Sequence, residues 1–440
     1  MSIRRTAAVA AAALSVFAAT PAYAEQVTTS PAGAGAGWLA RQLVDGERFE
    51  VDYGGKLYPD HGGTIDAVLA FAAAGVAEDN ALKATAWLAK PAVLPGYLGD
   101  PKDTSYAGAY AKLALTAQVR GEDPTAFGGV DLIAGLNSLL TPSGRFSDKS
   151  PYPGDYSNGF SQSFAVLALE RHGTAPEAAV DYLAKSACPG GGFPLELAAA
   201  TCVPQVDATA MAVQALLAVN PAERAAADPT EDAADPAKDA ANPAEDAADP
   251  AKEATDPAKV AAAGVKWLVE QQQADGGFID VLQKGEAGTT TNANTTGLAA
   301  QALRVAGSTA AADKAVAYLR ALQVGCGDAN TGAIAYDAKG FSPANANRAT
   351  AQAVLGLVGT GFATLTSARA KAAAPVLDCT APATEVATPP APAGPQAQQP
   401  EVLARTGVPV TPALWLGTLL VVAGALALVL GRRRVAPVRR

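Results

Sequence analysis

The sequence predicts an all-α fold, specifically an α/α toroid of about six helix-hairpin repeats. Alanine is abundant in a composition that is 49% hydrophobic but only 6% aromatic, and alanine-rich chains favour helix over sheet. One spacing also recurs without gaps. Four times, two adjacent residues of which the second is leucine are followed by a phenylalanine, eleven residues after the first of the two. The four pairs are Trp38-Leu39 with Phe49, Gly135-Leu136 with Phe146, Tyr182-Leu183 with Phe193, and Trp267-Leu268 with Phe278. A fixed period of this kind is typical of repeat folds.

The segment 264–307 shows the repeat unit most clearly. Its first part has apolar residues at helical spacing and stops at Asp275-Gly276-Gly277, where glycine tolerates the backbone angles that end a helix. Phe278 then serves as an apolar plug. A polar loop reaches Asn294, a candidate N-cap for a second helix. The unit is therefore helix, turn with plug, loop and helix.

Each unit ends in a helix of small residues, and six such pairs are the number that closes a ring. These second helices are expected at 64–74, 106–119, 161–171, 207–219, 295–306 and 347–358. Their alanines allow close approach, so we expect them to form the inner ring. Two further units begin at Trp87 and at Tyr318, the latter followed by an irregular loop. An open solenoid is the alternative arrangement for such repeats.

The Gln272-x-x-Asp275-Gly276-x-Phe278 motif resembles the glutamine-to-aromatic repeat of squalene and hopene cyclases. The unit as a whole resembles the prenyltransferase and terpenoid-cyclase repeat, which complement-type thioester domains and cobalamin carriers share. The resemblance covers residues 37–361 and implies the toroid. It implies no single function, because one scaffold carries several unrelated activities.

The start of the chain resembles a secretory signal. Residues 1–24 combine Arg4-Arg5, an apolar run and the small-x-small site Ala22-Tyr23-Ala24. The alternative is a hydrophobic first helix of the fold. Export predicts an extracytoplasmic protein whose cysteines can oxidise.

Most of the net charge of −9 comes from an insert at 222–259, built on a seven-residue Asp-Pro-Ala repeat. Proline once every two turns excludes a coiled coil, so we expect a disordered spacer, with an acidic interaction segment as the alternative. The rest of the chain is nearly balanced in charge, and no basic stripe indicates nucleic acid.

The end of the chain resembles a sortase sorting signal of Gram-positive surface proteins. A Pro/Ala-rich stalk at 380–402 precedes a 403–440 segment with a transmembrane helix at 413–431 and a basic tail. The sorting motif consists of Leu403, Ala404, Arg405, Thr406 and Gly407. Alanine at 404, where proline is usual, resembles the variant that class E sortases recognise. The resemblance implies cleavage after Thr406 and transfer to a peptidoglycan precursor; a permanent membrane anchor is the alternative.

Four cysteines in an exported chain predict two disulfides. Cys188 and Cys202 flank one Gly-rich loop, and Cys326 and Cys379 would fasten the last helix to the ring. A zinc site is the alternative, but neither histidine lies near a cysteine in the sequence, so no metal and no cofactor are expected.

Three mechanisms known on this scaffold lack their residues here. The chain has no Asp-x-Asp-Asp acid of class II cyclases, no assignable zinc ligands of prenyltransferases, and no Cys-Gly-Glu-Gln thioester. We therefore expect a non-catalytic ligand-binding or structural module whose ligand is an unknown small molecule or surface component. The alternative is an enzyme acting on an isoprenoid or a polysaccharide.

Polar residues near the starts of the inner helices form the candidate binding site at one mouth of the ring. They are His61, Asp66, Tyr106, Asp207, Asn294, Asn345 and Arg348. Helix capping is the simpler explanation for several of them. Their convergence would instead create a ligand-binding funnel.

Overall fold

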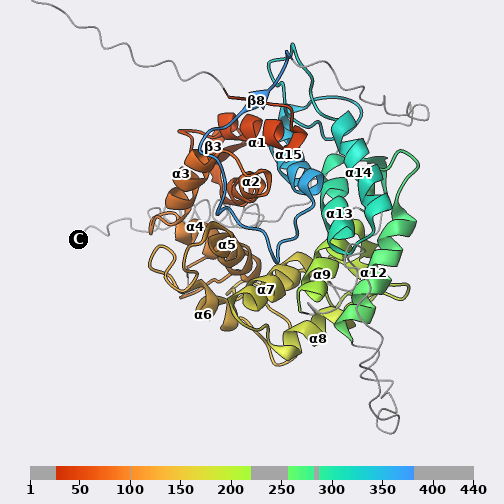
Figure 1. The fold of residues 1–440 in the computed structure, drawn as a ribbon. Coiled ribbons are helices and arrows are strands. Elements are labelled where there is room, and N and C mark those ends of the chain that lie inside the picture. Colours follow the sequence, from red (N-terminus) through yellow and green to blue (C-terminus); the bar gives the residue numbers. More distant parts are fainter. Residues whose placement is uncertain (1–25, 101, 220–255, 282–286, 381–440) are drawn as a thin grey trace, which may run out of the picture.

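The computed structural model describes residues 26–100, 102–219, 256–281 and 287–380. Over these residues, six helices form an inner ring and six form an outer ring around it (Figure 1). The inner helices are α2 (His61–Ala74), α5 (Ala107–Arg120), α7 (Gly159–His172), α9 (Val206–Ala218), α13 (Ala293–Val305) and α15 (Pro343–Val358). The outer helices are α1 (Pro31–Gln42), α3 (Glu78–Leu88), α6 (Leu132–Asn137), α8 (Glu177–Lys185), α12 (Pro257–Gln271) and α14 (Thr309–Ala321). Because α15 packs against both α1 and α2, the ring is closed, and the predicted toroid is confirmed.

Strands and one short helix, α4 (Leu94–Leu98), occur in the connections. Three antiparallel pairs lie between an outer helix and its inner partner, and one parallel pair joins the two ends of the described chain. The antiparallel pairs are β2 (Phe49–Tyr53) with β3 (Lys56–Asp60), β4 (Phe193–Pro194) with β5 (Pro204–Gln205), and β6 (Ile279–Val281) with β7 (Ala287–Thr291). The parallel pair is β1 (Val27–Thr28) with β8 (Val376–Leu377).

Small residues let the inner helices approach one another closely, as predicted. The backbones of α13 and α15 lie particularly close together. A Cβ atom placed on Gly297 of α13 would lie 2.3 Å from the carbonyl oxygen of Gln352 on α15, so only glycine fits there. The six inner helices are each preceded by an outer partner, so they all run in the same direction.

The four predicted phenylalanine plugs occupy equivalent places under the inner helices. Each is at most 2% exposed, and each backbone N–H donates to a side chain in the first turn or two of the inner helix that follows. The acceptors are Thr64 for Phe49 (2.9 Å), Gln162 for Phe146 (3.0 Å), Thr209 for Phe193 (2.8 Å) and Thr296 for Phe278 (3.0 Å). In the sixth unit Ile334 takes this place, donating to Thr350 at 3.0 Å. A buried N–H needs such a partner, so the bond fixes the depth of each plug.

Glutamine side chains link the fifth unit to the sixth and the sixth unit to the first. The Gln272 amide donates to the carbonyls of Gly276 in its own loop and Ala311 at the start of α14, both at 2.9 Å. Gln323 does the same with Gly332 (3.0 Å) and with Pro31 (2.8 Å), the first residue of α1. The motif behind the family resemblance is therefore a clamp between neighbouring units, and Gln323 uses it to close the ring.

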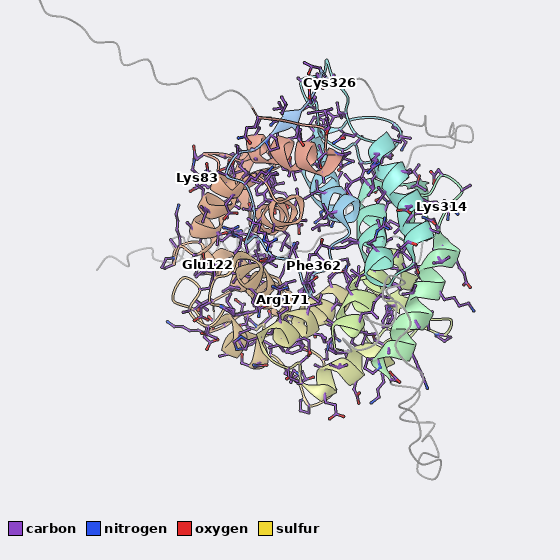
Figure 2. All side chains as sticks on the ribbon, in the orientation of Figure 1. Lys83, Glu122, Arg171, Lys314, Cys326 and Phe362 are labelled. Atoms are coloured by element: carbon purple, nitrogen blue, oxygen red, sulfur yellow. A yellow bond between two sulfur atoms is a disulfide. The ribbon has the colours of Figure 1, made fainter. Side chains whose placement is uncertain are left out.

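A strap, residues 359–375, closes one face of the ring. It leaves α15 and crosses the middle of the ring, contacting the C-terminal parts of α13, α9, α7, α5 and α2 in turn (Figure 1). Its bonds are Gln301 Nε2 to the Thr360 carbonyl (2.7 Å), the Phe362 N–H to Gln214 Oε1 (3.2 Å), Arg171 Nη1 to the Phe362 carbonyl (2.8 Å), the Ser367 N–H to the Val119 carbonyl (3.0 Å), and the Lys371 N–H to the Gly75 carbonyl (2.9 Å). Figure 2 shows Phe362 near the middle of the ring with Arg171 beside it. We call this side the C-terminal face and the side where the inner helices begin the N-terminal face.

Both predicted disulfides are present. Cys188–Cys202 spans the loop of the fourth unit, and Cys326–Cys379 ties the chain after the strap to the loop of the sixth.

We expect peptide mapping of the non-reduced protein to find these two links and no others. Replacing Cys188 and Cys202 with serine should cost about 3 kcal/mol of stability, since the bond closes a short loop. A Cys202–Cys326 peptide would contradict the pairing.

Several predicted segments lie outside the described residues. They are the signal at 1–24, the sorting motif and the membrane span at 413–431, and nearly all of the insert. The last residues assigned to the insert, Pro257 to Lys259, form the first turn of α12, with Asp256 as the N-cap. No described helix is long and apolar enough to cross a membrane.

Candidate functional site

The N-terminal face carries two polar clusters on opposite sides of the ring. Around the inner ring the order is α2, α5, α7, α9, α13 and α15, so α2 lies opposite α9. The α2/α5 cluster consists of His61, Asp66, Tyr97 and Lys112. The α9/α13 cluster consists of Asp207, Asp280, Thr295 and Arg348, with Asn294 next to Thr295 in the sequence.

Aromatic rings hold His61 at the start of α2. Its imidazole lies between Trp87 and Tyr97, with ring centroids 5.1 and 5.8 Å away. Burial lowers the pKa of His61, although Asp60 and a hydrogen bond to the Val93 carbonyl oppose the change. The imidazole is therefore neutral at pH 7, and its surroundings favour a packed rather than a charged role.

Asp66 pairs with Lys112 of α5, not with His61. The Lys112 ammonium lies 2.5 Å from the Asp66 carboxylate and also donates to the Gly62 carbonyl at 3.3 Å. The same ammonium is 6.0 Å from the ring of Phe164, which in turn meets the Phe362 ring of the strap edge-on at 5.8 Å. The acid/base pair that His61 and Asp66 could have formed is therefore absent, because Asp66 is neutralised by a lysine.

Asp207, in the first turn of α9, is the most perturbed acid of the N-terminal face. Burial, and then the nearby charge of Asp280 on β6, raise its pKa to about 7. The Thr295 hydroxyl and the Arg348 guanidinium act in the opposite direction without cancelling the rise. Its Oδ1 atom is buried and has no hydrogen-bond partner. The neutral form of the carboxyl is favoured by this burial and by the nearby negative charge, so Asp207 holds a proton up to about neutral pH.

The first turn of the neighbouring α13 adds two more buried side-chain oxygens, one of which belongs to the hydroxyl that acts on the Asp207 carboxyl. They are Asn294 Oδ1 and Thr295 Oγ1. Asn294 is not the N-cap predicted from the sequence; Asn292 takes that role and accepts the Thr295 N–H at 3.0 Å. Asp207 is not a cap either, because the N-cap of α9 is Gln205. Capping therefore explains neither Asn294 nor Asp207.

Tyr106 and Asn345 do not join either cluster. Tyr106 is the N-cap residue of α5 and packs against the core, while its helix is capped from another loop by Asp148, which accepts the Ala107 N–H at 2.8 Å. Asn345 lies in the first turn of α15, after the N-cap Ser342. Of the seven predicted mouth residues, Asp207 and Arg348 come together, Asn294 lies in the first turn of α13 beside Thr295, and His61 and Asp66 lie across the ring from them.

A second pair of acids, Asp148 and Asp155, lies on the connection before α7. Burial raises the pKa of Asp148 to about 6, although the hydrogen bond from the Ala107 N–H acts to lower it. Burial also acts to raise the pKa of Asp155, but the N–H groups of Asp148 and Ser157 and the Arg145 guanidinium outweigh it and lower the pKa. Both carboxylates accept backbone N–H groups, so their role is to hold this connection.

Lys112, Asp280 and Thr295 carry no local signal that marks them as site residues in the sequence. Lys112 lies among apolar residues within a helix, and Asp280 follows a plug in what looked like a solvated loop. Only the fold brings Asp280 near Asp207, which is 73 residues earlier in the chain.

The comparisons with known proteins give architecture alone. No protein-family model matches the chain, and no curated protein matches it. An unsaturated glucuronyl hydrolase from a Bacillus species is 12% identical, with 76% of this chain and 98% of that chain covered and a TM-score of 0.49. A type II terpene cyclase from Scytonema is 15% identical, with 74% and 96% covered and a TM-score of 0.47.

A cellobiose 2-epimerase from Bacillus thermoamylovorans is 12% identical, with 73% and 95% covered and a TM-score of 0.47. All three are enzymes. The expectation of a non-catalytic module therefore finds no support among them, but similarities this low carry no argument about the function of this chain.

Proposed function

We propose that the protein is an acid–base enzyme of the bacterial cell surface that cleaves glycosidic bonds at the N-terminal face, with Asp207 as the general acid. The observation that carries this proposal is the buried carboxyl of Asp207, whose pKa of about 7 keeps it protonated near neutral pH beside a second carboxylate, Asp280. Glycoside cleavage by two carboxyl groups in different environments is a general enzymatic strategy.

The reaction follows from these roles. The Asp207 carboxyl gives its proton to the glycosidic oxygen as the bond from that oxygen to the anomeric carbon breaks. The Asp280 carboxylate stabilises the positive charge that develops on the sugar. Water then adds to the anomeric carbon, and the proton it releases returns to Asp207. One water is consumed, and both carboxyl groups regain their starting states.

Two features favour a sugar over an isoprenoid. Phe362 and Leu365 of the strap, each 2% exposed, occupy the C-terminal side of the ring, where a long apolar substrate would otherwise extend. The N-terminal face instead presents carboxyl, amide, hydroxyl and guanidinium groups, which suit the hydroxyls of a carbohydrate.

The pH dependence of turnover tests the proposal. Because the acid must be protonated, kcat/KM on the oligosaccharide that is cleaved should fall about tenfold per pH unit above about pH 7. Reducing-end release from a panel of neutral oligosaccharides measures it, and geranylgeranyl diphosphate serves as the isoprenoid comparison. Turnover of the isoprenoid alone, or a rate that rises through pH 7 to 9, would contradict the proposal.

We further propose that the enzyme is exported and linked to peptidoglycan by a sortase. The 1–24 signal, the Leu403–Gly407 motif and the 413–431 span support this location, and the two disulfides fit an oxidising compartment.

The sorting proposal predicts that Thr406→Ala leaves the protein in the membrane instead of the wall. The substitution removes the residue whose carbonyl would be transferred to the peptidoglycan amine. Wild-type protein should resist detergent and be released by muralytic enzymes, whereas the variant should be extracted by detergent. A variant that behaves as wild type would exclude sorting at this motif, and Thr411→Ala, just outside it, is the matched control.

A further inference from the structure

An arm formed by β2 and β3 projects from the N-terminal face. Phe49 at its base is buried, Asp60 at its end caps α2, and every residue from Tyr53 to Pro59 is exposed. The strands are joined at Gly54 and Gly55, whose φ angles of 66° and 85° give the tight turn that a two-residue hairpin needs. The arm is thus rigidly attached at its base and open to solvent at its tip.

The exposed tip is unusually apolar. Tyr53, Leu57 and Tyr58 are 45%, 62% and 39% exposed. Tyr53 pairs with Lys56 and Tyr58 with Val51, so the two tyrosines share one face of the arm. Their rings meet edge-on at 6.0 Å, and the Lys56 ammonium lies 4.8 Å from the Tyr58 ring. Clustered, exposed apolar side chains on a projecting hairpin indicate an interaction surface.

The arm belongs to the same face as Asp207. Its second strand runs directly into α2, and the connection before α7 places two more exposed tyrosines, Tyr152 (65%) and Tyr156 (48%), at that face. Tyrosine offers a flat apolar ring with a hydroxyl at its edge, which suits the apolar face and hydroxyl rim of a sugar ring.

The charge around the arm indicates which class of polymer it can bind. Around the arm, Glu47, Glu50, Asp52 and Asp60 outnumber Arg48 and Lys56, and Arg48 is already bound to Glu47 and Glu50. A negative surface repels polyanions such as nucleic acids or phosphate-rich polymers. An uncharged polysaccharide is not repelled by this surface.

We propose that the β2–β3 arm binds an uncharged polysaccharide, whose sugar rings pack on Tyr53 and Tyr58 as the chain leads toward Asp207. This inference rests on the proposed function and names its substrate class. The binding itself does not require turnover, so the two can fail separately.

Affinity electrophoresis of the full-length chain in detergent tests the proposal. The parent is Asp207→Asn, which cannot consume the polymer under the proposed mechanism. Its migration should be slowed by at least one neutral polysaccharide among dextran, mannan and mixed-linkage β-glucan, and not by hyaluronan or heparin. Adding Tyr53→Ala and Tyr58→Ala should weaken the apparent affinity at least tenfold. Tyr53→Phe with Tyr58→Phe should keep most of it, because the rings remain.

The matched control is Leu82→Ala, which removes a comparably exposed apolar side chain (51%) from the outer helix α3. It should migrate as the parent does, and all variants should keep the melting temperature of the parent because the arm tip is exposed. The proposal is overturned if the double alanine variant binds as the parent does, if only the polyanions slow migration, or if no polymer does. If turnover survives Asp207→Asn while the arm still binds, Asp207 is not the general acid, and the proposal that the arm binds polysaccharide is retained.

Discussion

Asp207→Asn should abolish turnover and at the same time stabilise the protein at alkaline pH. Losing a general acid typically lowers the rate by about 10²- to 10⁴-fold, and asparagine cannot supply the proton. The same change removes a carboxyl whose pKa in the folded protein is about 7, compared with 3.8 for the free side chain. Activity and stability should therefore move in opposite directions.

The sign of the stability effect follows from linkage. Between about pH 4 and 7 the folded state holds a proton that the unfolded state has lost, so this carboxyl makes the protein less stable as the pH rises through that range. Asparagine cannot ionise and escapes this loss. Near pH 4 the two proteins should have similar stability, and at pH 8 the variant should be more stable by roughly 2–4 kcal/mol.

Thermal melts at pH 4.5 and 8 measure the change, which for a domain of this size amounts to at least several degrees at pH 8. Asp313→Asn is the matched control, because its carboxyl lies on the outer helix α14 with 69% of the side chain exposed. It should alter neither rate nor melting temperature at either pH. A fully active Asp207→Asn protein, or one destabilised at pH 8, would show that Asp207 is an ordinary ionised carboxylate.

Local patterns predicted the ring because its repeating contacts are local. The offset between each leucine pair and its phenylalanine spans one helix end and one loop, and each plug makes its hydrogen bond to a residue 15 to 18 positions later. The sixth unit departs from the offset because its loop is longer, and Ile334 therefore takes the plug position with no aromatic signal to reveal it.

The strap could not be predicted in the same way. Residues 359–375 have no helical or strand period, and their partners lie on five different helices far apart in the chain. The candidate site shares this difficulty. Asp207 was identified as a residue near a helix start, but its proton depends on burial and on Asp280, which the sequence alone does not place beside it.

Phe362→Ala should be among the most destabilising single substitutions in the chain. The Phe362 ring is 2% exposed and contacts Phe164 of α7, and its backbone is held by Gln214 of α9 and Arg171 of α7. Truncating a buried phenylalanine removes its apolar burial and leaves a cavity that the rigid helix ends around it cannot close. Such changes cost about 3–5 kcal/mol.

Denaturant unfolding of the full-length chain measures this cost, and the midpoint should shift while the slope stays the same. Thr364→Ala is the matched control, because Thr364 lies two residues further along the strap and is exposed. It should change the stability by less than about 0.5 kcal/mol. If Phe362→Ala also costs less than about 1 kcal/mol, the strap rests on the ring without being part of its core. A full cost instead means that the strap is part of the same packing that holds the ring together.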